Sequence, residues 1–321
     1  MAFPYVSLVV VNYNGQDIIG KCLQSLSEIS YPKKSYETIV VDNASSDRSI
    51  SIIKKFKVKL ITNRENMGYV GVNACLGKAR GKYLFILNND LELDNNCVRA
   101  LVDVLEKDKS AAIGAPKFIN YFDRKIESSG TWVSRAFYTG HYADAGEEQK
   151  LKEIPYLGIE MVRTELAKKF GYIYDPDYFI YAEDLDLSLR MKLMGYRTMY
   201  VPEAVVYHMH AITTKKNRSG RMTFLLERNL LMTFFKALSW KSIMLYLPYV
   251  LLMRAIALSK DLITLNFRQF YSRAKALSWI AFNFGKVMKR RKQVQKFRKV
   301  QDKEVLSVFS EKHMFRKKAF L

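Results

Sequence analysis

Residues 6 to 12 read Val-Ser-Leu-Val-Val-Val-Asn, and this stretch decides the fold class. Apolar and mostly β-branched residues follow one another in it without regular polar alternation. Such a run is typical of a parallel strand that is buried on both faces. The segment therefore predicts a sheet covered on both sides rather than a sheet with one face in water.

The next 80 residues repeat the same pattern. Apolar runs that predict strands alternate with amphipathic segments that predict helices: strands at 37–42, 58–62 and 82–87, and helices at 18–26, 47–56 and 71–79. Strands that alternate with helices are joined by right-handed crossovers and form a parallel sheet. The fold class predicted from the pattern is α/β, with a mostly parallel sheet and helices on both faces.

Polar residues follow each of these four predicted strands. They are Asn12, Asp42, Asn63 and the segment Asn88 to Asp90. In open sheets of this kind, ligands bind beyond the carboxyl ends of the strands, so these side chains predict a nucleotide-type site. The alternative is that Asn and Asp are there because they favour turns.

The later sequence is less regular. Residues 113–155 mix short apolar runs with turn residues and predict an insertion beside the main sheet. Helices are predicted at 161–170 and at 185–194, where Gly195 is a stop signal, and short strands at 198–201 and 204–206. From Thr223 onward the pattern is helical.

Three carboxylates, Glu183, Asp184 and Asp186, crowd the start of the helix predicted at 185–194. They have two interpretations, because a carboxylate there can cap the helix or act as a general base. Asp186 and Arg190 are four residues apart and can pair with each other. That pairing would leave Asp184 available for chemistry.

Asp90 stands where an apolar strand meets a polar loop. A carboxylate there can hold a hard divalent cation, which in turn holds the phosphates of a donor. His208 and His210 follow the strand predicted at 204–206. Because alternate residues of a strand face opposite ways, we do not expect both histidines to serve one site.

Five motifs follow one another along the chain. They are Val11-Asn12-Tyr13-Asn14-Gly15, Val40 to Asp47 (Val-Val-Asp-Asn-Ala-Ser-Ser-Asp), Asn63 to Tyr69 (Asn-Arg-Glu-Asn-Met-Gly-Tyr), Leu87-Asn88-Asn89-Asp90, and Glu183-Asp184-Leu185-Asp186-Leu187 with His208. In this order and spacing they resemble family-2 glycosyltransferases of the GT-A fold, most of all the branch that includes rhamnosyltransferases. The resemblance spans about residues 5 to 215.

The resemblance implies a role for each matching position. Asn12 and Asp42 would contact the base and ribose of the donor, and Arg64 and Asn73 would line the donor pocket. Asn88 occupies the first position of the metal motif, where many relatives carry Asp, and we count it among the donor-binding residues. Asp90 and His208 would bind a divalent metal, Mg²⁺ or Mn²⁺. Asp184 would be the catalytic base.

The implied reaction is inverting transfer of a sugar from a UDP- or dTDP-sugar to an acceptor hydroxyl, in a lipid-linked or cell-surface glycan. Two other protein classes are the alternatives. A sugar nucleotidyltransferase would carry a Gly-rich signature with Lys and Arg near its first strand, and Val11 to Gly15 does not supply one. A basic nucleic-acid-binding protein would carry a base-reading motif, and none is recognised, so a nucleic-acid partner is not expected.

The charge of the chain is concentrated in its last third. The net charge is +21, yet residues 211–321 hold 25 Lys and Arg against 5 Asp and Glu, whereas residues 1–210 hold 27 and 26. Such asymmetry predicts a polyanionic partner. We therefore divide the chain into a GT-A catalytic domain, 1–222, and a basic helical membrane-associating region, 223–321.

The apolar run at 243–253 contains Pro248 and is followed by Arg254. It is shorter than the roughly 20 residues that span a bilayer, which favours helices that lie on an anionic membrane surface. A full span across 243–258 is the alternative. The three cysteines show no metal or redox spacing, and the first residues show no signal peptide pattern. These features predict a cytoplasmic protein at the inner face of the cell membrane.

Overall fold

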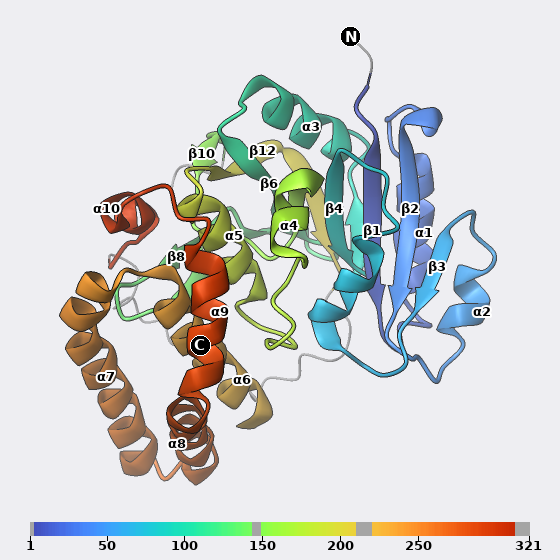
Figure 1. Cartoon of the computed structure of the whole chain (residues 1–321). Helices are drawn as coiled ribbons and strands as arrows, with labels where there is room; N and C mark the ends of the chain where they lie inside the picture. Colours follow the sequence, from blue (N-terminus) through green and yellow to red (C-terminus); the bar gives the residue numbers. More distant parts are fainter. Residues whose placement is uncertain (1–2, 143–148, 210–219, 312–321) are drawn as a thin grey trace.

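A ten-stranded sheet forms the centre of the structure, a computed structural model that describes residues 3–142, 149–209 and 220–311 (Figure 1). Eight strands follow the order β10-β12-β6-β11-β4-β1-β2-β3, while β5 pairs with β12 and β7 pairs with β6. The α/β class and the GT-A-like arrangement of a mostly parallel sheet with a C-terminal helical region are confirmed.

The first four strands are parallel and lie within one residue of their predicted bounds: β1 (Val6–Asn12), β2 (Tyr36–Asp42), β3 (Lys59–Thr62) and β4 (Tyr83–Asn88). Asn12 pairs in register with Asp42, and Val11 pairs with Asn88. The polar residues that end these strands therefore meet at one edge of the sheet, as predicted.

The middle of the chain completes the sheet with strands that run both ways. They are β5 (Leu91–Leu93), β6 (Ala111–Asn120), β7 (Ile126–Ser128), β10 (Lys152–Glu153), β11 (Glu160–Arg163) and β12 (Arg197–His208), while β8 (Gly130–Val133) and β9 (Thr139–Tyr142) form a separate pair. The prediction that 113–155 lies beside the main sheet was wrong for β6. Its first seven residues are buried, and it lies between β11 and β12.

Helices cover both faces of the sheet. They include α1 (Ile19–Glu28), α2 (Ser49–Ile53), α3 (Cys97–Lys107), α4 (Thr164–Phe170), α5 (Glu183–Leu193) and the 3-10 segments η1 (Lys33–Ser35) and η2 (Gly68–Cys75). Alternate residues of β1 join two different cores. Val6, Leu8 and Val10 pack with α1 and α3, whereas Val9 and Val11 pack with the elements on the other face.

Two predicted helices were wrong in part. The helix predicted at 71–79 is the 3-10 segment η2, and residues 161–163 belong to β11 before α4 begins. Pairing with β4 and β6 holds residues 161–163 extended, because these partners satisfy the backbone of Met161 and Val162. Helical periodicity alone could not reveal those partners.

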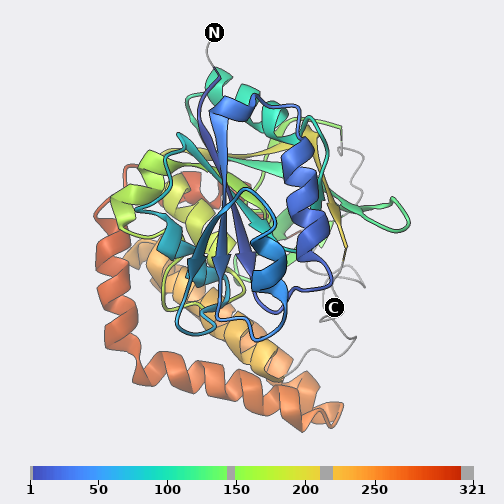
Figure 2. The same cartoon turned by 90° about the vertical axis from the view of Figure 1, so that its right-hand side faces the viewer.

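The last third of the described chain is helical, as predicted: α6 (Gly220–Ala237), α7 (Trp240–Ile263), α8 (Phe267–Phe282), α9 (Phe284–Gln295), α10 (Asp302–Val305) and η3 (Leu306–Val308). Figures 1 and 2 place α7 and α8 at the same end of the molecule as the carboxyl ends of β1 to β4. Buried residues of α6 and α9 share one hydrophobic cluster with the sheet. The domain boundary at 222 stays a prediction, although α6 packs as part of the catalytic core.

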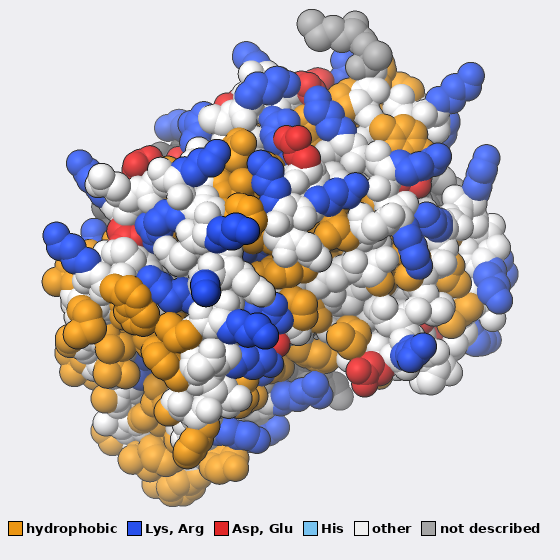
Figure 3. Space-filling model, in the orientation of Figure 1, with side chains coloured by type: hydrophobic (Ala, Val, Ile, Leu, Met, Phe, Trp, Pro, Cys, Tyr) orange, Lys and Arg blue, Asp and Glu red, His pale blue; other side chains and the backbone are white. Residues whose placement is uncertain are grey.

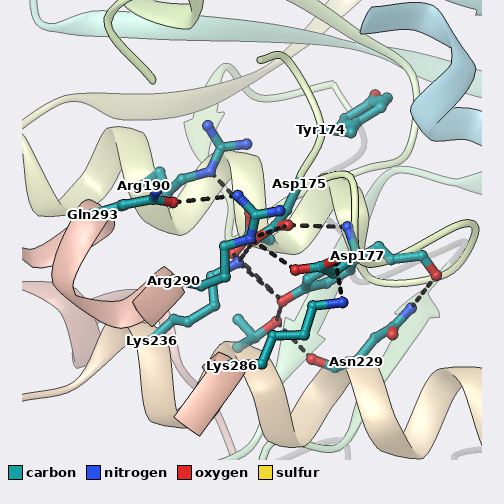
Figure 4. Close-up of polar contacts among 12 residues, drawn as sticks. Tyr174, Asp175, Asp177, Arg190, Asn229, Lys236, Lys286, Arg290 and Gln293 are labelled. Carbon is teal, nitrogen blue, oxygen red and sulfur yellow. Dashed lines mark hydrogen bonds and ion pairs between the residues drawn. The ribbon is translucent and has the colours of Figure 1, made fainter. Parts of the chain in front are cut away.

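Seven charged residues join α5, α6 and α9 to the loop that precedes α5 (Figure 4). We call this the buried ion cluster, and it comprises Asp175, Asp177, Asp186, Arg190, Lys236, Lys286 and Arg290. The Lys236 ammonium lies 2.5 Å from a carboxylate oxygen of Asp175 and 2.6 Å from one of Asp186. Because Lys236 is on α6 and Asp186 on α5, the cluster ties the helical region to the catalytic core.

Candidate active site

Asn12 and Asp42 lie side by side at the edge where β1 and β2 end. Both are fully buried, and the Asn12 amide donates to the Asp42 carboxylate at 2.7 Å. Asp42 also accepts hydrogen bonds from the backbone N–H of Ser45, at 2.9 Å, and from the Ser45 hydroxyl. The Asn89 amide donates to the Asn12 oxygen at 2.8 Å, which joins the end of β4 to the same corner.

Gly15 leaves room for the side chains of Asn89 and Asn12, which lie close to its backbone. A Cβ atom at Gly15 would lie 2.2 Å from the Asn89 amide nitrogen and 2.6 Å from the Asn12 oxygen. Any other residue would therefore push these two side chains apart. The Asn14-Gly15 pair of the first motif thus has a structural reason.

Asp90 and His208 come from distant parts of the chain and meet at the next corner. The Nε2 atom of His208, at the end of β12, lies 3.3 Å from a carboxylate oxygen of Asp90. The Nδ1 atom of His208 lies 3.0 Å from Glu127 of β7, which sequence reasoning missed. Burial alone lowers the pKa of His208, but hydrogen bonds to Asp90 and Glu127 outweigh it and raise the pKa to about 9.

This pair fits the divalent cation that the GT-A fold implies, although it is incomplete by itself. A carboxylate and an imidazole are ligands for Mn²⁺, and a carboxylate behind the imidazole is a common outer partner of metal-binding histidines. Within residues 3–142, 149–209 and 220–311, no group of three or more His, Cys, Asp or Glu is placed to hold a metal. The remaining ligands would then have to come from the donor diphosphate and water. His210 lies outside the described residues.

Asp184 begins α5 next to two other acidic side chains. Burial raises the pKa of the Asp184 carboxyl to about 6, although its side chain is only half-buried. Burial and the Asp184 charge hold the pKa of both Glu183 and Glu160 well above the usual range of Glu. We call these three residues the acidic group. It favours a single negative charge on Asp184 near neutral pH.

Asp186, two residues later, lies in the buried ion cluster instead. The Arg190 Nε atom is 2.9 Å from one Asp186 oxygen, and Lys236 is close to the other. The predicted pairing of Asp186 with Arg190 is therefore confirmed. Among the described residues, no ion pair joins Asp184 to a cation.

The loop that delivers Asp184 to the site has an unusual backbone. Phe179, Tyr181 and Ala182 have φ angles of 73°, 73° and 60°, which cost free energy for residues other than glycine. The Asn229 amide of α6 donates to the backbone oxygens of Ile180, at 2.9 Å, and Tyr181, at 2.7 Å. Thus α6 holds the loop before the candidate base, although the sequence analysis assigned most of α6 to the membrane-associating region.

Tyr69 interacts electrostatically with Asp90 and with two residues of the acidic group, Glu183 and Asp184. Burial is the largest cause that raises the pKa of its phenol, and the charges of Asp90, Glu183 and Asp184 raise it further. The Tyr69 backbone N–H donates to the oxygen of Phe179 at 2.8 Å. The Tyr69 phenol is therefore neutral, and only its place in the third motif hinted at its link to these carboxylates.

Three other predicted donor residues lie around the same edge of the sheet. Arg64 is exposed beyond β3, and Asn88 is half-buried at the end of β4. The Asn73 oxygen accepts from the backbone N–H groups of Ile173 and Tyr174, and its amide donates to the oxygen of Tyr174. These bonds join η2 to the chain before α5, so the donor role of Asn73 stays a prediction.

Comparison with known proteins gives the family. Residues 7–169, slightly more than half of the chain, match the family model described as glycosyl transferase family 2. The chain belongs to glycosyltransferase family 2. It is therefore a glycosyltransferase, and the matched region contains Asn12, Asp42 and Asp90.

A curated relative from Methanococcus voltae is named dolichyl N-acetyl-alpha-D-glucosaminyl phosphate 3-beta-D-2,3-diacetamido-2,3-dideoxy-beta-D-glucuronosyltransferase. It is 20% identical over 225 residues, which cover 66% of this chain and 69% of that protein.

Two solved structures show the same fold. GalNAc-T7 with UDP, GalNAc and Mn²⁺ has a TM-score of 0.61 at 18% identity, and the match covers 73% of this chain but only 48% of that one. The mannosyltransferase PcManGT from Pyrobaculum calidifontis, in complex with GDP-Man and Mn²⁺, has a TM-score of 0.55 at 18% identity. That match covers 92% of this chain and 86% of the other, so the likeness in fold reaches into the C-terminal helices.

Proposed function

We propose that this protein transfers a sugar, with inversion, from a UDP- or dTDP-sugar to a hydroxyl of a lipid-linked or cell-surface glycan. The observation that carries the proposal is Asp184, a half-buried carboxylate without a cation partner among the described residues and with a pKa of about 6. A general base works best when its pKa lies near the working pH. Family membership supports glycosyl transfer and displaces the nucleotidyltransferase and nucleic-acid alternatives.

In this mechanism, the Asn12–Asp42 pair binds the base and ribose of the donor at the ends of β1 and β2. Asp184 takes the proton of the acceptor hydroxyl as its oxygen attacks the anomeric carbon, and the diphosphate leaves. Asp90 and His208 would hold a divalent cation, which neutralises charge on the departing diphosphate when it is bound. Two neighbours in fold were solved with Mn²⁺, which supports a divalent metal.

A test of the reaction measures release of nucleoside diphosphate from UDP- and dTDP-sugars, with and without Mn²⁺. We expect turnover that EDTA abolishes and Mn²⁺ restores, and the deoxyhexose donor dTDP-rhamnose tests the rhamnosyltransferase branch. Asp90→Ala should require far more Mn²⁺ than the wild type. Full turnover in EDTA by the wild type would overturn the metal proposal.

The lipid-linked acceptor is supported by the relative from Methanococcus voltae, whose name describes a dolichyl-phosphate-linked sugar. It is also supported by the surface of α7 and α8. Figure 3 shows hydrophobic side chains gathered over α7 and the turn to α8, with Lys and Arg beside them. The exposed apolar residues there include Met244, Leu245, Leu251, Leu252, Ile256, Ile263, Leu265, Phe267 and Phe282.

We propose that this surface docks on an anionic membrane rather than that α7 crosses it. By length and composition, α7 could cross a membrane. However, Arg254 and Asp261 on one face of α7 are buried and lie 3.7 Å from Glu227 of α6 and 2.9 Å from Arg273 of α8, respectively. A span would take these ion pairs into lipid, whereas docking leaves them against the protein.

Flotation with phosphatidylglycerol vesicles tests the docking. The full chain should float at low salt, and Ile263→Glu with Phe267→Glu should abolish flotation, because both side chains are more than half exposed. Phe122→Glu is the matched control, since Phe122 is 75% exposed in the turn after β6. A wild-type protein that stays in the soluble fraction would rule docking out.

A further inference from the structure

A cleft of about 670 Å³ lies between the first half of α6 and α8, outside the corner formed by Asn12, Asp42 and Asp90. Its lining residues are Phe179, Gly220, Arg221, Phe224, Leu225, Arg228, Arg268, Tyr271, Ser272 and Lys275. A larger cleft, about 970 Å³, is lined by Tyr36, Glu37 and Thr38 at the amino end of β2, away from the ends where ligands bind.

The cleft between α6 and α8 is positively charged and has no compensating carboxylate among its described lining residues. Four of its described lining residues are Arg or Lys and none is Asp or Glu. Arg228 is buried and donates to the backbone oxygens of Asp177, at 2.9 Å, and Tyr178, at 2.8 Å. In the described part of the chain, Arg221, Arg268 and Lys275 form no ion pair, and all three are exposed.

Elsewhere in this helical region, several cations that are buried or half-buried meet carboxylates. Lys236 meets two of them, Arg273 meets Glu227 and Asp261, and Arg290 meets Asp175 and Asp177. The cations that line the cleft have no such carboxylate among the described lining residues. Uncompensated cations around a concave surface attract an anion, and arginines are suited to phosphate oxygens.

The other half of the lining is apolar. Phe179, Phe224 and Leu225 contribute to it, with the Arg221 guanidinium 4.8 Å from the Phe179 ring and the Lys275 ammonium 5.3 Å from the Phe224 ring. Along α8, the exposed Tyr271 leads from the cleft to Phe267 and then to Leu265 in the turn. A ligand that matches both the cationic and the apolar part of the lining has an anionic head and an aliphatic chain.

The cleft also borders the loop that precedes the candidate base. Phe179 in its lining lies five residues before Asp184, in the loop with positive φ angles. The backbone oxygen of Phe179 accepts a hydrogen bond from the backbone N–H of Tyr69. Burial and the charges of Asp90 and Asp184 raise the pKa of the Tyr69 phenol. An anion in this cleft would therefore sit against the segment that carries the reaction centre.

We infer that this cleft binds the phosphate of a lipid-linked acceptor, with the lipid chain along α8 toward the exposed apolar surface of α7 and α8. The head group is held by Arg221, Arg268 and Lys275, and the part to be glycosylated extends past Phe179 to Asp184. This assignment rests on the proposed function, because it takes the acceptor to be lipid-linked. A phospholipid head group has the same phosphate chemistry and must be distinguished by experiment.

The test uses binding to the full chain, which does not depend on turnover. Farnesyl phosphate, farnesol and inorganic phosphate are titrated by calorimetry below the micelle concentration of the lipid. We expect farnesyl phosphate to bind about tenfold or more tightly than either of the other two, because only it has both halves. Arg268→Gln with Lys275→Gln should weaken its binding about tenfold, whereas farnesol binding stays unchanged.

Lys289→Gln with Lys292→Gln is the matched control, because it removes two charges from α9, outside the cleft. The two exposed cleft substitutions are not expected to unfold the protein, and circular dichroism checks this. In vesicle flotation, the cleft variant should float nearly as well as the wild type.

Equal binding of farnesyl phosphate by the cleft variant and the control would overturn the proposal. The proposal would also be overturned if the cleft variant lost flotation on phosphatidylglycerol vesicles but still bound farnesyl phosphate. The cleft would then bind the head groups of the membrane. If farnesyl phosphate binds through the cleft but nucleotide sugars are never turned over, the proposed function fails and the cleft assignment survives as a lipid-phosphate site.

Discussion

The two sides of α5 carry the same kind of side chain in opposite electrostatic surroundings. On one side, no residue of the acidic group (Glu160, Glu183 and Asp184) forms an ion pair among the described residues, and the pKa values of the group are raised. On the other, Asp175 and Asp186 meet Lys236, and the pKa of Asp175 is lowered, because the Lys236 charge outweighs the effect of burial.

The difference shows how one helix can carry a carboxylate that stabilises the fold and another that can accept a proton. A carboxylate fully paired with buried cations cannot accept a proton near neutral pH, so it serves as a structural tie. A carboxylate that is desolvated without a cation has a raised pKa and can accept one. The assignment of Asp184 as base and Asp186 as tie stays a prediction that the following experiments can break.

The largest expected effect is that of Asp184→Asn. Loss of a general base lowers kcat by about 10² to 10⁴-fold, while donor binding is retained. Turnover of a UDP- or dTDP-sugar and thermal shift with the nucleotide measure the two properties. If Asp184→Asn remains active while folded Asp186→Asn is inactive, the two roles are reversed.

The second prediction concerns the ion pairs that join α5 to α6. Lys236→Met leaves buried carboxylates without their cation and should lower the free energy of unfolding by about 3–5 kcal/mol. Lys286→Met is the control, because the Lys286 side chain is 50% exposed where it pairs with Asp177, and surface pairs contribute roughly 0–1 kcal/mol. Urea unfolding measures both. Equal losses would show that the buried ion cluster is not a tie between α5 and α6.

The third prediction is a pH dependence. Since the pKa of Asp184 is about 6 and the base must be unprotonated, kcat/KM should rise about tenfold per pH unit below pH 6 and level off above it. The measurement needs saturating Mn²⁺, because protons also compete for His208, whose pKa is about 9. The residual activity of Asp184→Asn should lack this rise, and a flat wild-type profile from pH 5 to 7 would contradict the assignment.

The smallest effect is expected for Glu160→Gln. Burial and the Asp184 charge raise the pKa of Glu160 well above the usual range of Glu, which favours a neutral carboxyl that the neutral Gln side chain resembles. Its Oε1 accepts from Ser188 at 3.1 Å, and the amide oxygen of Gln can do the same. We expect kcat within about threefold of the wild type. A loss as large as that of Asp184→Asn would move the base to Glu160.

Much of the active-site prediction from sequence rested on residues that end strands. Asn12 pairs in register with Asp42, and Asn88 pairs with Val11, so the residues that end these parallel strands meet at one edge of the sheet. The pairing of Asp186 with Arg190 was predictable as well, since four residues make one turn of α5. Both results follow from local periodicity.

What sequence reasoning missed depends on contacts between distant segments. Glu127 reaches His208 only because β7 pairs with β6 beside β12. Tyr69 of η2 meets the loop before α5 through its backbone N–H, which donates to the oxygen of Phe179. Asn229 has no motif at all, yet it holds that loop. No spacing in the chain encodes these approaches.

The sequence by itself determined the parallel α/β core, the family and the basic character of the last third, because these depend on hydrophobic periodicity, motifs and composition. Only the tertiary structure placed Lys236 of α6 against Asp186, as a second cation beside Arg190. Asp184 and Asp186 are two residues apart in one helix, and a helix turns by roughly 200° between such positions. That turn brings Asp186 to the Lys236 ammonium, whereas Asp184 has no ion-pair partner among the described residues and its pKa is raised.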